Sequence, residues 1–407
     1  MTSQPVLVVW EHGGNLGHLT RLLPILQALE ARGHSIVFAV ARPQALAALP
    51  PNTGMKIIQA PQAAMPMAFE SSAICPADIW LRCGFASPPH AKACVTQWLA
   101  LFEGLNPVAV LVDASPMALY AAKVAGISAL ALGHGFELPP AQAGLSFAPW
   151  QNDTAEGIAH SEQVLESALI SLAGSWRPDS ILRHATSVSA LLSLTSRAVC
   201  TWPELDHFER DLEAADFLGP IWHGLPGAQL LPWPDKPGAK VLCYIDVADK
   251  RYDLLWQAIK QHSANVLVLS PSGNDRACQA ARGWGITVCQ QPVQLDTLLP
   301  QCDAVIGHGG MGLTSMALHA GKPVMLLPKQ LEQGLLAYRL VQRGLAVSTT
   351  SCVNKLQIQS RVAQLFQDTA LHESAKRLSV RYAEFSPQRA VDLVLDRLLG
   401  ASPQSHP

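Results

Sequence analysis

The sequence is poor in charged and in aromatic side chains. Charged residues make up 15% of its 407 residues and aromatic residues 6%, and 29 basic against 31 acidic side chains leave a formal net charge of −2. A chain that binds a nucleic-acid backbone or anionic lipid headgroups needs an excess of positive charge, which this composition excludes. Hydrophobic residues make up 49%, so the composition is that of a folded, apolar-rich globular protein.

The nine cysteines are an odd number and include no C-x-x-C pair. This spacing fits neither a disulfide framework nor a zinc site, and we expect reduced thiols. Residues 1–5 carry no basic side chain, and the apolar run Val6–Trp10 is too short for a signal peptide or a membrane span. We therefore expect a cytoplasmic protein without an integral membrane segment.

Short apolar runs alternate with helical patterns along the chain. The run Val6–Trp10 is followed by a glycine-rich loop and by leucines whose spacing predicts a helix from near Thr20 to Arg32. Repeated β-α-β units of this kind predict an α/β protein with parallel sheets covered by helices on both faces. Further strands are expected at Ser35–Val40, Val108–Val112, Lys240–Ile245, Asn265–Leu269, Gly285–Cys289 and Asp303–Gly307.

A proline-rich stretch between Gly219 and Gly238 divides the chain, because its proline density excludes a helix or a central strand. Two Rossmann-like domains of similar size are predicted on either side. The expected organisation is a first domain over 1–219, a linker over 220–238, a second domain over 239–400 that ends in a helical segment at 374–399, and a tail over 401–407. Residues 137–196 predict helices and loops, which we interpret as a wall for an acceptor.

Two glycine clusters follow predicted strands, at Glu11–His18 and at Gly307–Gly312. In open α/β sheets, ligands bind beyond the carboxyl ends of the strands, where helix N-termini attract anions. The second cluster matches G-x-G-x-x-G, but it comes late in its domain, whereas a dinucleotide site prefers the first strand. Binding of NAD is therefore the least favoured interpretation.

The sequence around the second cluster carries a more specific pattern. His308-Gly309-Gly310-Met311-Gly312-Leu313-Thr314 is followed by Ala317–Pro323 and then by Glu332-Gln333. This resembles the donor-binding signature of the nucleotide-sugar glycosyltransferases with two Rossmann-like domains, the GT-B architecture of the UDP-glycosyltransferase-like superfamily. Gly17-His18, leading into a helix that ends Arg32-Gly33-His34, is similar to the opening of the same enzymes.

The resemblance implies an inverting glycosyltransferase whose first domain binds a small-molecule acceptor. His18 would be the general base that deprotonates the acceptor hydroxyl, and Asp113, at the end of a neighbouring strand, would orient its ring. His12 on the same loop is the competing base. Without the resemblance, we would interpret His18 as a polar loop residue and Asp113 as a residue that caps the end of a strand.

For the second domain, the resemblance implies a site for a UDP- or dTDP-linked sugar, with the reaction in the cleft between the domains. His308 would hold the diphosphate together with glycines and a hydroxyl, Glu332 and Gln333 would take sugar hydroxyls, and the base would lie near Val293. The other residues implied in donor binding are Gly14, Gly17, Gly309, Gly310, Gly312 and Thr314. No Asp-x-Asp pair occurs, so neither a metal nor a further cofactor is expected.

The residues of the second site also have purely structural interpretations that require no ligand. The glycines at 309–312 would also suit a tight turn with positive φ, and Glu332-Gln333 would suit a solvated helix start.

Three residues depart from the family pattern. Met316 stands where a ribose-binding Glu is common, Asp246 lies in a loop that is usually of Gly-Ser type, and Arg21 replaces a usual proline. An aspartate that faced a diphosphate would repel it. These departures keep two alternatives open, a non-catalytic sugar-nucleotide-binding or partner protein and a nucleotide-sugar epimerase or hydrolase on the same fold.

Overall fold

The protein is described by a computed structural model. It describes residues 4–13, 16–46, 54–61, 72–151, 154–176, 182, 185–210, 217–224, 227–249, 252–262, 264–350, 352 and 354–400. The contacts within the chain divide it into two units. The first unit is Met1–Trp202, Phe208–Ile221 and Pro387–Pro407, and the second is Pro203–His207 and Trp222–Ser386. The domain limits expected at residues 219 and 239 stay a prediction.

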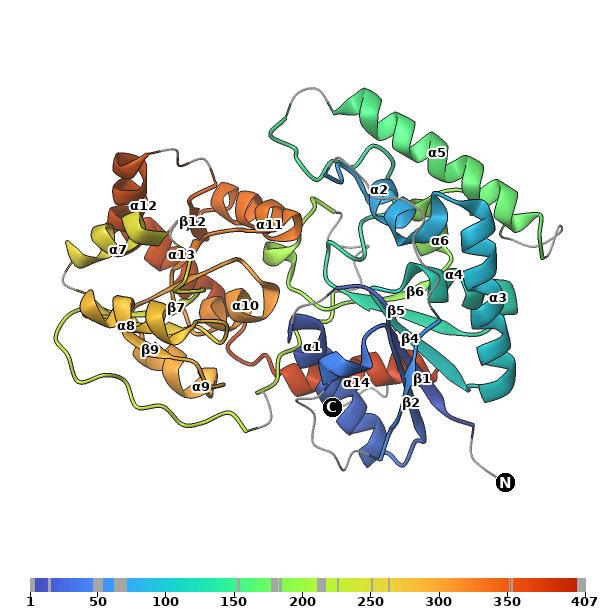
Figure 1. Ribbon diagram of the computed structural model, residues 1–407, viewed down its shortest axis with the longest axis horizontal. Coiled ribbons are helices and arrows are strands. Elements are labelled where there is room, and N and C mark those ends of the chain that lie inside the picture. The colour runs from blue at the N-terminus through green and yellow to red at the C-terminus, as the bar shows by residue number, and fades with distance from the viewer. Residues whose placement is uncertain are drawn as a thin grey trace. The chain divides into compact units, whose positions relative to one another are not determined.

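The first unit is built around a sheet of six parallel strands in the order β3-β2-β1-β4-β5-β6. Every residue of β1, β2, β4 and β5 is buried, because helices cover the sheet and such strands require apolar sequence on both faces (Figure 1). The strands are β1 (Val6–Trp10), β2 (Ile36–Val40), β3 (Lys56–Gln59), β4 (Ala109–Asp113), β5 (Ala129–Gly133) and β6 (Ser196–Val199).

The helix after β1 begins earlier than its sequence predicts. It starts at Leu16 instead of near Thr20, so that Pro24 lies inside it and removes one backbone hydrogen bond. The early start places His18 and Arg21 in the first two turns of this helix. The helices of the first unit are α1 (Leu16–Ala31), α2 (Pro76–Trp80), α3 (Pro88–Leu105), α4 (Pro116–Ala125), α5 (Ala155–Ala173), α6 (Val188–Ser193) and α14 (Pro387–Leu399).

The second unit repeats this architecture around six parallel strands in the order β12-β11-β10-β7-β8-β9. The two sheets confirm the predicted α/β fold class. The strands are β7 (Lys240–Tyr244), β8 (Asn265–Leu269), β9 (Thr287–Cys289), β10 (Ala304–Gly307), β11 (Val324–Leu326) and β12 (Ala346–Ser348). The helices are α7 (Asp253–Lys260), α8 (Asp275–Gly283), α9 (Leu295–Leu298), α10 (Met311–His319), α11 (Leu331–Gln342), α12 (Lys355–Gln367) and α13 (Thr369–Arg381).

The single helical segment predicted over 374–399 is two helices, α13 and α14. The break falls just before Pro387, because proline disfavours the helical conformation in the residue that precedes it. Helix α14 packs against α1 and against β4 of the first unit, as the red and blue helices in Figure 1 show.

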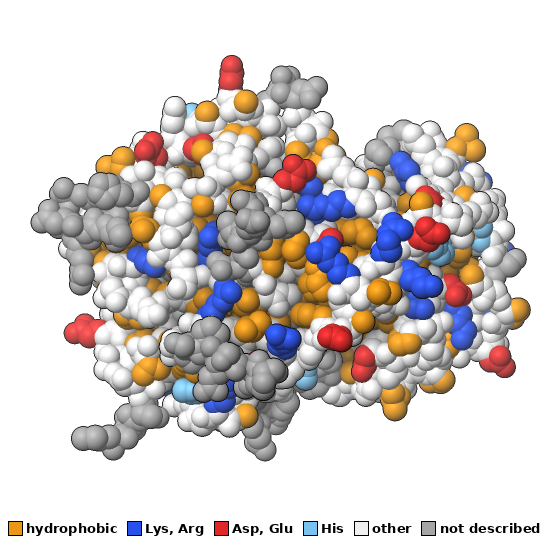
Figure 2. Space-filling model, turned by 180° about the vertical axis from the view of Figure 1, so that it is seen from behind, with side chains coloured by type: hydrophobic (Ala, Val, Ile, Leu, Met, Phe, Trp, Pro, Cys, Tyr) orange, Lys and Arg blue, Asp and Glu red, His pale blue; other side chains and the backbone are white. Residues whose placement is uncertain are grey.

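Among the residues that the structure describes, no helix is both long and apolar enough to span a lipid bilayer. Acidic side chains lie among the basic ones on the face shown in Figure 2. This mixture agrees with the near balance of charge in the sequence.

Candidate active site

The carboxyl ends of β1 and β4 bring the two predicted catalytic residues together. Trp10 and Asp113, the last residues of these strands, are partners in the parallel register. His18 lies in the first turn of α1, and its ring stacks on Trp10 with 5.4 Å between the ring centroids. Nδ1 of His18 lies 3.0 Å from Oδ1 of Asp113. The two side chains therefore form a hydrogen-bonded pair, and their catalytic roles stay a prediction.

The turn after β4 fixes Asp113, whose side chain is fully buried. The next residue, Ala114, has a left-handed φ of 44°. The Ser115 hydroxyl donates to the carbonyl oxygen of Asp113 at 2.7 Å and accepts from the backbone N–H of Glu11 at 2.8 Å. These bonds tie the turn to the loop after β1 and offset a backbone strain of about 1–3 kcal/mol.

The buried Arg21 forms an ion pair with the same carboxylate of Asp113. Its Nη2 lies 2.5 Å from Oδ1 of Asp113 and 3.1 Å from Nδ1 of His18, and its Nε donates to Oδ2 of Asp113 at 3.3 Å. Burial acts to lower the pKa of Arg21, but Asp113 and Glu137 raise it more strongly, so that the guanidinium stays charged. The sequence had marked Arg21 only as a departure from the family pattern.

Glu137, in the turn after β5, completes this group. Its Oε1 accepts from Nη2 of Arg21 at 3.3 Å, and its Oε2 accepts from the backbone N–H of His134 at 2.9 Å. Nδ1 of His134 lies 2.7 Å from the same Oε2. Burial alone would raise the pKa of Glu137, yet His134 and Arg21 together hold that pKa well below its usual range, so the carboxyl is ionised.

Among the described residues, none forms a hydrogen bond with Nε2, the other nitrogen of the His18 ring, and Gly13 of the loop after β1 lies beside it. The backbone at Gly13 approaches so closely that a Cβ there would lie 2.4 Å from Nε2 of His18, and Gly13 has a φ of +94°. Only glycine fits this position without moving the ring. Sequence reasoning placed Gly13 within a cluster but gave it no role.

Two other glycines of this region were predicted to bind the donor. Gly14 lies outside the described residues. Gly17 is exposed in the first turn of α1, and a Cβ there would have nothing within 4 Å. Its predicted role therefore has no support from close packing.

Ligand atoms of His18, Asp113 and Glu137 lie within 4.8 Å of one another, a spacing that would suit a metal ion. The guanidinium of Arg21 contacts all three side chains. A fixed positive charge at this position repels a metal ion, so these residues fit an arginine better than a metal.

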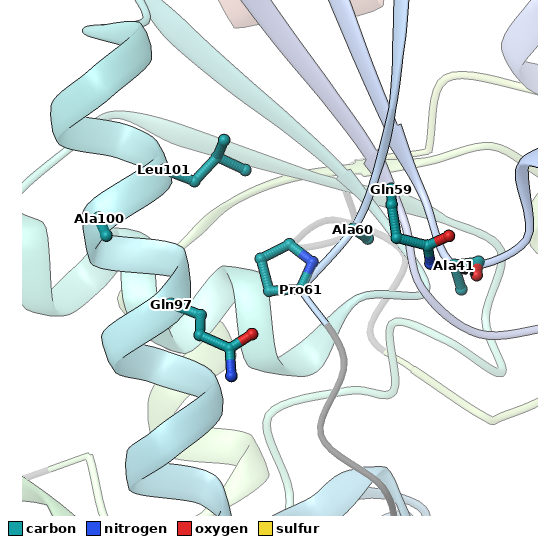
Figure 3. A pocket seen from close by; sticks show the side chains of 7 residues that line it. All are labelled: Ala41, Gln59, Ala60, Pro61, Gln97, Ala100 and Leu101. Atoms are coloured by element: carbon teal, nitrogen blue, oxygen red, sulfur yellow. Dashed lines mark hydrogen bonds between the residues drawn. The ribbon is translucent and has the colours of Figure 1, made fainter.

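A hollow of about 870 Å³ opens at the carboxyl ends of β2 and β3 (Figure 3). Since β2 is the neighbour of β1, the hollow belongs to the same end of the sheet as His18 and Asp113. Two amides and several small apolar side chains line it, a surface suited to an apolar molecule with a few polar groups. The lining residues are Ala41, Gln59, Ala60, Pro61, Gln97, Ala100 and Leu101.

In the second unit, His308 follows β10 and is fixed by its Nδ1. This atom lies 3.0 Å from the carbonyl oxygen of Leu327 and 3.3 Å from the hydroxyl oxygen of Tyr252. Because a carbonyl oxygen only accepts hydrogen bonds, Nδ1 carries a hydrogen. His308 is thereby held at the start of α10.

The glycines after His308 form the turn into α10. Gly309 has a φ of +89°, a left-handed conformation that favours glycine, and Gly310 is the N-cap of the helix. Gly312 lies in the first turn, where an added Cβ would meet nothing within 4 Å, and Thr314 is buried one turn on. A helix start of this kind presents unpaired backbone N–H groups, which attract a phosphate.

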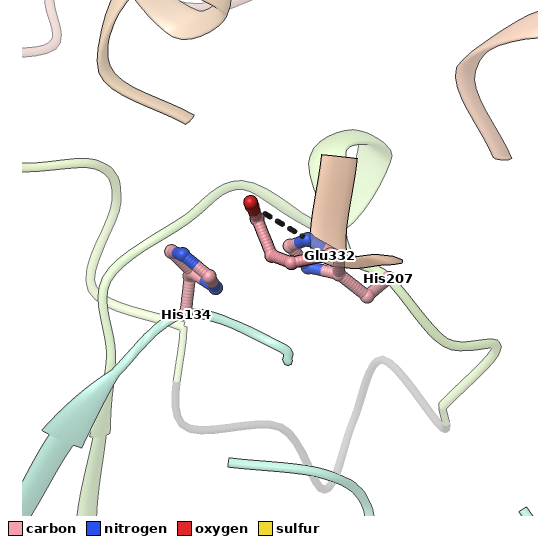
Figure 4. Close-up of side chains that lie close together, drawn as sticks. All are labelled: His134, His207 and Glu332. Carbon is pink, nitrogen blue, oxygen red and sulfur yellow. Dashed lines mark hydrogen bonds and ion pairs between the residues drawn. The ribbon is translucent and has the colours of Figure 1, made fainter. Parts of the chain in front are cut away.

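Glu332 and Gln333 lie in the first turn of α11. Oε1 of Gln333 accepts from the backbone N–H of Lys329 at 3.0 Å, which orients the amide. Oε1 of Glu332 lies 3.2 Å from Nε2 of His207, as the dashed line in Figure 4 shows. His207 is fully buried, and sequence reasoning missed it because the contact joins residues 125 positions apart.

Two arginines hold the segment that carries His207, Arg339 in α11 and Arg343 directly after it. Nε of Arg339 donates to the carbonyl oxygen of His207 at 3.2 Å. Nη1 of Arg343 donates to the carbonyl oxygens of Glu204 at 2.7 Å and of Asp206 at 3.1 Å. These bonds fix the histidine that contacts Glu332.

The loop after β7 carries the aspartate that departs from the family pattern. Oδ1 of Asp246 accepts from the backbone N–H of Ala248 at 2.9 Å, and this hydrogen bond stabilises the turn that contains Asp246. A second carboxylate of the loop, Asp249, lies 3.0 Å from Nζ of Lys329, which also sits over the Tyr252 ring at 5.4 Å. Both acidic residues therefore have partners. Lys329 is a cation near His308, and the sequence had suggested that either it or Lys322 could face the diphosphate if it is more than a surface lysine.

The segment predicted to hold the nucleobase pairs with the proline-rich stretch. Val293 forms an isolated parallel bridge with Gln229. The backbone N–H of Gln229 donates to the carbonyl oxygen of Pro292 at 2.9 Å, and that of Gln294 donates to the carbonyl oxygen of Gln229 at 3.0 Å. Val293 is thus fixed in place, and its role in binding stays a prediction.

Comparison with known proteins adds to this geometry. Residues 285–395 match the family model described as the C-terminal domain of erythromycin biosynthesis protein CIII-like proteins. A stretch of 119 residues is 31% identical to NDP-glycosyltransferase YjiC of Bacillus subtilis (strain 168), and it covers 26% of this chain and 30% of that relative. The chain therefore matches less than a third of this relative's length.

Two solved structures are similar over nearly the whole chain. The calicheamicin glycosyltransferase CalG4 has a TM-score of 0.69 at 20% identity and covers 99% of this chain and 100% of its own. The glycosyltransferase VinC, solved in complex with dTDP, has a TM-score of 0.65 at 17% identity and covers 97% of this chain and 99% of its own. The resemblance drawn from the sequence is thereby confirmed at the level of the fold: residues 285–395 match the EryCIII-like C-terminal domain model, and the chain has the two-Rossmann GT-B fold seen in these two solved structures.

Proposed function

We propose that this protein is a glycosyltransferase that moves a sugar from a nucleoside diphosphate to a small-molecule acceptor, with inversion at the anomeric carbon. The observation that carries the proposal is the pair of His18 and the buried Asp113, 3.0 Å apart. The YjiC relative is an NDP-glycosyltransferase, and VinC was solved with dTDP, which supports a nucleotide-sugar donor.

In this mechanism Nε2 of His18 takes the proton of the acceptor hydroxyl. The acceptor oxygen forms a bond to the anomeric carbon from the face opposite the diphosphate, and the bond from that carbon to the diphosphate oxygen breaks. The diphosphate leaves with the electron pair, and the configuration is inverted. The Asp113 carboxylate stabilises the imidazolium that forms on His18.

The donor is assigned to the second unit. The start of α10, with His308, Gly309, Gly310, Gly312 and Thr314, would hold the diphosphate because its backbone N–H groups face outward at the positive end of the helix. Glu332 and Gln333 would bind sugar hydroxyls, and Val293 would lie against the base of UDP or dTDP.

The acceptor is assigned to the hollow at the ends of β2 and β3, whose small apolar lining suits a compact molecule of low polarity. The Arg21 guanidinium favours chemistry without a metal at His18. Cytoplasmic location remains part of the proposal and fits the nine cysteines, which are all free thiols.

Calorimetric titration with UDP, dTDP, GDP and NAD tests the donor site, with the His308→Ala variant as comparison. Micromolar binding of one diphosphate that is lost in the variant supports the proposal. Binding of none of the four would favour the non-catalytic partner protein, and binding of NAD alone would overturn the donor assignment.

Turnover of the matching nucleotide sugar tests the base. His18→Ala should lower kcat by about 10²–10⁴-fold, the usual contribution of a general base, whereas His12→Ala on the same loop should leave kcat unchanged. Proton NMR of the product should show the inverted anomeric configuration. A product with retained configuration would contradict the proposed inversion. Consumption of the donor without an acceptor would also contradict the proposal and would favour an epimerase or hydrolase.

A further inference from the structure

The hydrogen bonds around His18 leave the position of its ring proton to be decided by Arg21. Nδ1 lies 3.0 Å from Oδ1 of Asp113, which can only accept, and 3.1 Å from Nη2 of Arg21, which can only donate. A neutral imidazole carries a hydrogen on one nitrogen only. The contact with Asp113 requires that hydrogen on Nδ1, whereas the contact with Arg21 requires it on Nε2. In the second form, Nε2 cannot take a proton from an acceptor.

The hydrogens of Arg21 resolve this competition. Nη2 of Arg21 carries two hydrogens, and three acceptor atoms lie within reach of it. These are Oδ1 of Asp113 at 2.5 Å, Nδ1 of His18 at 3.1 Å and Oε1 of Glu137 at 3.3 Å. Charged carboxylates accept more strongly than a neutral ring nitrogen. The two carboxylates therefore take both hydrogens, and none is left for Nδ1.

We propose that Glu137 is a positioning residue that draws the second N–H of Arg21 away from His18, so that Nδ1 keeps the ring hydrogen and Nε2 is the open base. The proposal rests on the proposed role of His18 as the general base. Glu137 does not touch the ring itself and acts through Arg21.

Two further observations support a fixed role for Glu137. Its Oε2 accepts from the backbone of His134 at 2.9 Å and lies 2.7 Å from the ring of His134, which points Oε1 toward Arg21. The fork between Arg21 and Asp113, through Nε and Nη2, fixes the plane of the guanidinium. Neither side chain is free to rotate away from the arrangement that the proton count requires.

The experiment compares Glu137→Leu with Glu137→Gln in the full-length protein labelled with ¹⁵N-histidine. Long-range ¹H–¹⁵N spectra report the tautomer of each histidine, and the His18→Asn variant assigns the signal of His18. We expect a hydrogen on Nδ1 in the wild type and in Glu137→Gln, whose amide oxygen still accepts from Arg21. In Glu137→Leu the hydrogen should move to Nε2.

Kinetics supply the second measurement. Glu137→Leu should lower kcat about 10–100-fold, part of the contribution of a general base, with the donor KM within about twofold because the donor is assigned to the other unit. Glu137→Gln should recover most of kcat. Glu162→Leu, which removes a half-buried carboxylate of α5 that accepts from the backbone N–H of Gly144, is the matched control and should leave both quantities unchanged.

A double variant keeps the test informative if Glu137→Leu folds poorly with an unbalanced buried cation. Arg21→Met with Glu137→Leu removes both the competing donor and its acceptor, so the hydrogen should return to Nδ1. Glu137→Leu with its hydrogen still on Nδ1 and unchanged kcat would overturn the proposal. Failure of His18 as the base is distinguishable, because His18→Ala would then keep its activity while the tautomer spectra still report on Glu137.

Discussion

Gly13 controls how closely the backbone approaches His18, and its replacement should slow transfer strongly. A Cβ at this position would lie 2.4 Å from Nε2 of His18, and the φ of +94° disfavours any other residue. Gly13→Ala should therefore displace the ring and lower kcat to near that of His18→Ala. Steady-state kinetics and circular dichroism measure activity and folding together.

Gly33 offers a matched control for the backbone strain alone. It has a φ of +80°, and an added Cβ would have nothing within 4 Å. Gly33→Ala should cost about 1 kcal/mol of the free energy of unfolding and leave kcat unchanged. Equal kcat in Gly13→Ala and the wild type would show that the ring tolerates the contact.

The Lys329–Asp249 pair should govern the affinity for a free diphosphate. The lysine nitrogen lies 3.0 Å from a carboxylate of a loop near His308, so Lys329→Met would leave a negative charge there unneutralised. We expect the Kd of the bound diphosphate to rise about tenfold, which corresponds to about 1.4 kcal/mol. Asp249→Asn combined with Lys329→Met should bring the Kd back close to the wild-type value.

Lys322→Met serves as control, because Nζ of Lys322 donates to the carbonyl oxygen of Pro300 instead. Its Kd should not change in calorimetric titration. If the double variant binds as weakly as Lys329→Met, the lysine contacts the diphosphate directly and does more than neutralise Asp249.

Sequence reasoning found the side chains that belong to local patterns and missed those that depend on distant contacts. His18 and His308 stand in recognisable strings after apolar runs, and Asp113 ends such a run. Glu137 and His207 have no such context, because their partners are 116 and 125 positions away. No periodicity in the sequence encodes a contact of that kind.

Strands were predictable where both faces are buried. The runs at Val6–Trp10 and Asn265–Leu269 agree with β1 and β8 to the residue, because every position in them is apolar or buried. The edge strand β3 went unnoticed because it is short and largely exposed, and so lacks a continuous apolar run. Helix α1 began earlier than expected, because Pro24 was read as a limit on where the helix starts.

The junction of β1 and α4 holds a carboxyl whose ionisation should cost stability. Burial raises the pKa of Glu11 to about 7, although Trp98 and the backbone N–H groups of Met117 and Ala118 favour the charged form. Because the pKa in the folded protein exceeds the ordinary value of 4.5, the neutral carboxyl favours the folded state. This contribution to the free energy of unfolding is complete below pH 4.5 and is lost as the pH rises through 7. Over the whole shift the difference amounts to about 3–4 kcal/mol.

Glu11→Gln isolates this effect, because the amide can still accept from Nε1 of Trp98 and does not titrate. Urea unfolding of both proteins gives the difference in the free energy of unfolding at each pH. We expect the variant to gain about 2–3 kcal/mol relative to the wild type between pH 5 and pH 8. Parallel stability curves over this range would mean that Glu11 is already ionised in the folded protein.

The chain passes between its two units more often than the prediction of two consecutive domains would require. Residues 203–207 belong to the second unit, and α14 returns to the first after the second is complete. Proline at 387 marks the break before α14 in the sequence, but an amphipathic helix carries no sign of which sheet it covers. Each unit's stability therefore depends on residues distant in sequence.

Leu395 in α14 tests this arrangement, because its side chain is fully buried in the first unit. Leu395→Ala should lower stability by about 2–5 kcal/mol, the usual cost of such a cavity. Hydrogen exchange should accelerate in β4, β5 and β6, which α14 contacts, and not in the second sheet. Leu336→Ala in α11, equally buried, should do the reverse and accelerate exchange in the second sheet. Equal acceleration in both sheets from Leu395→Ala would show that the two units unfold together, since local opening could then not be confined to the unit that holds α14.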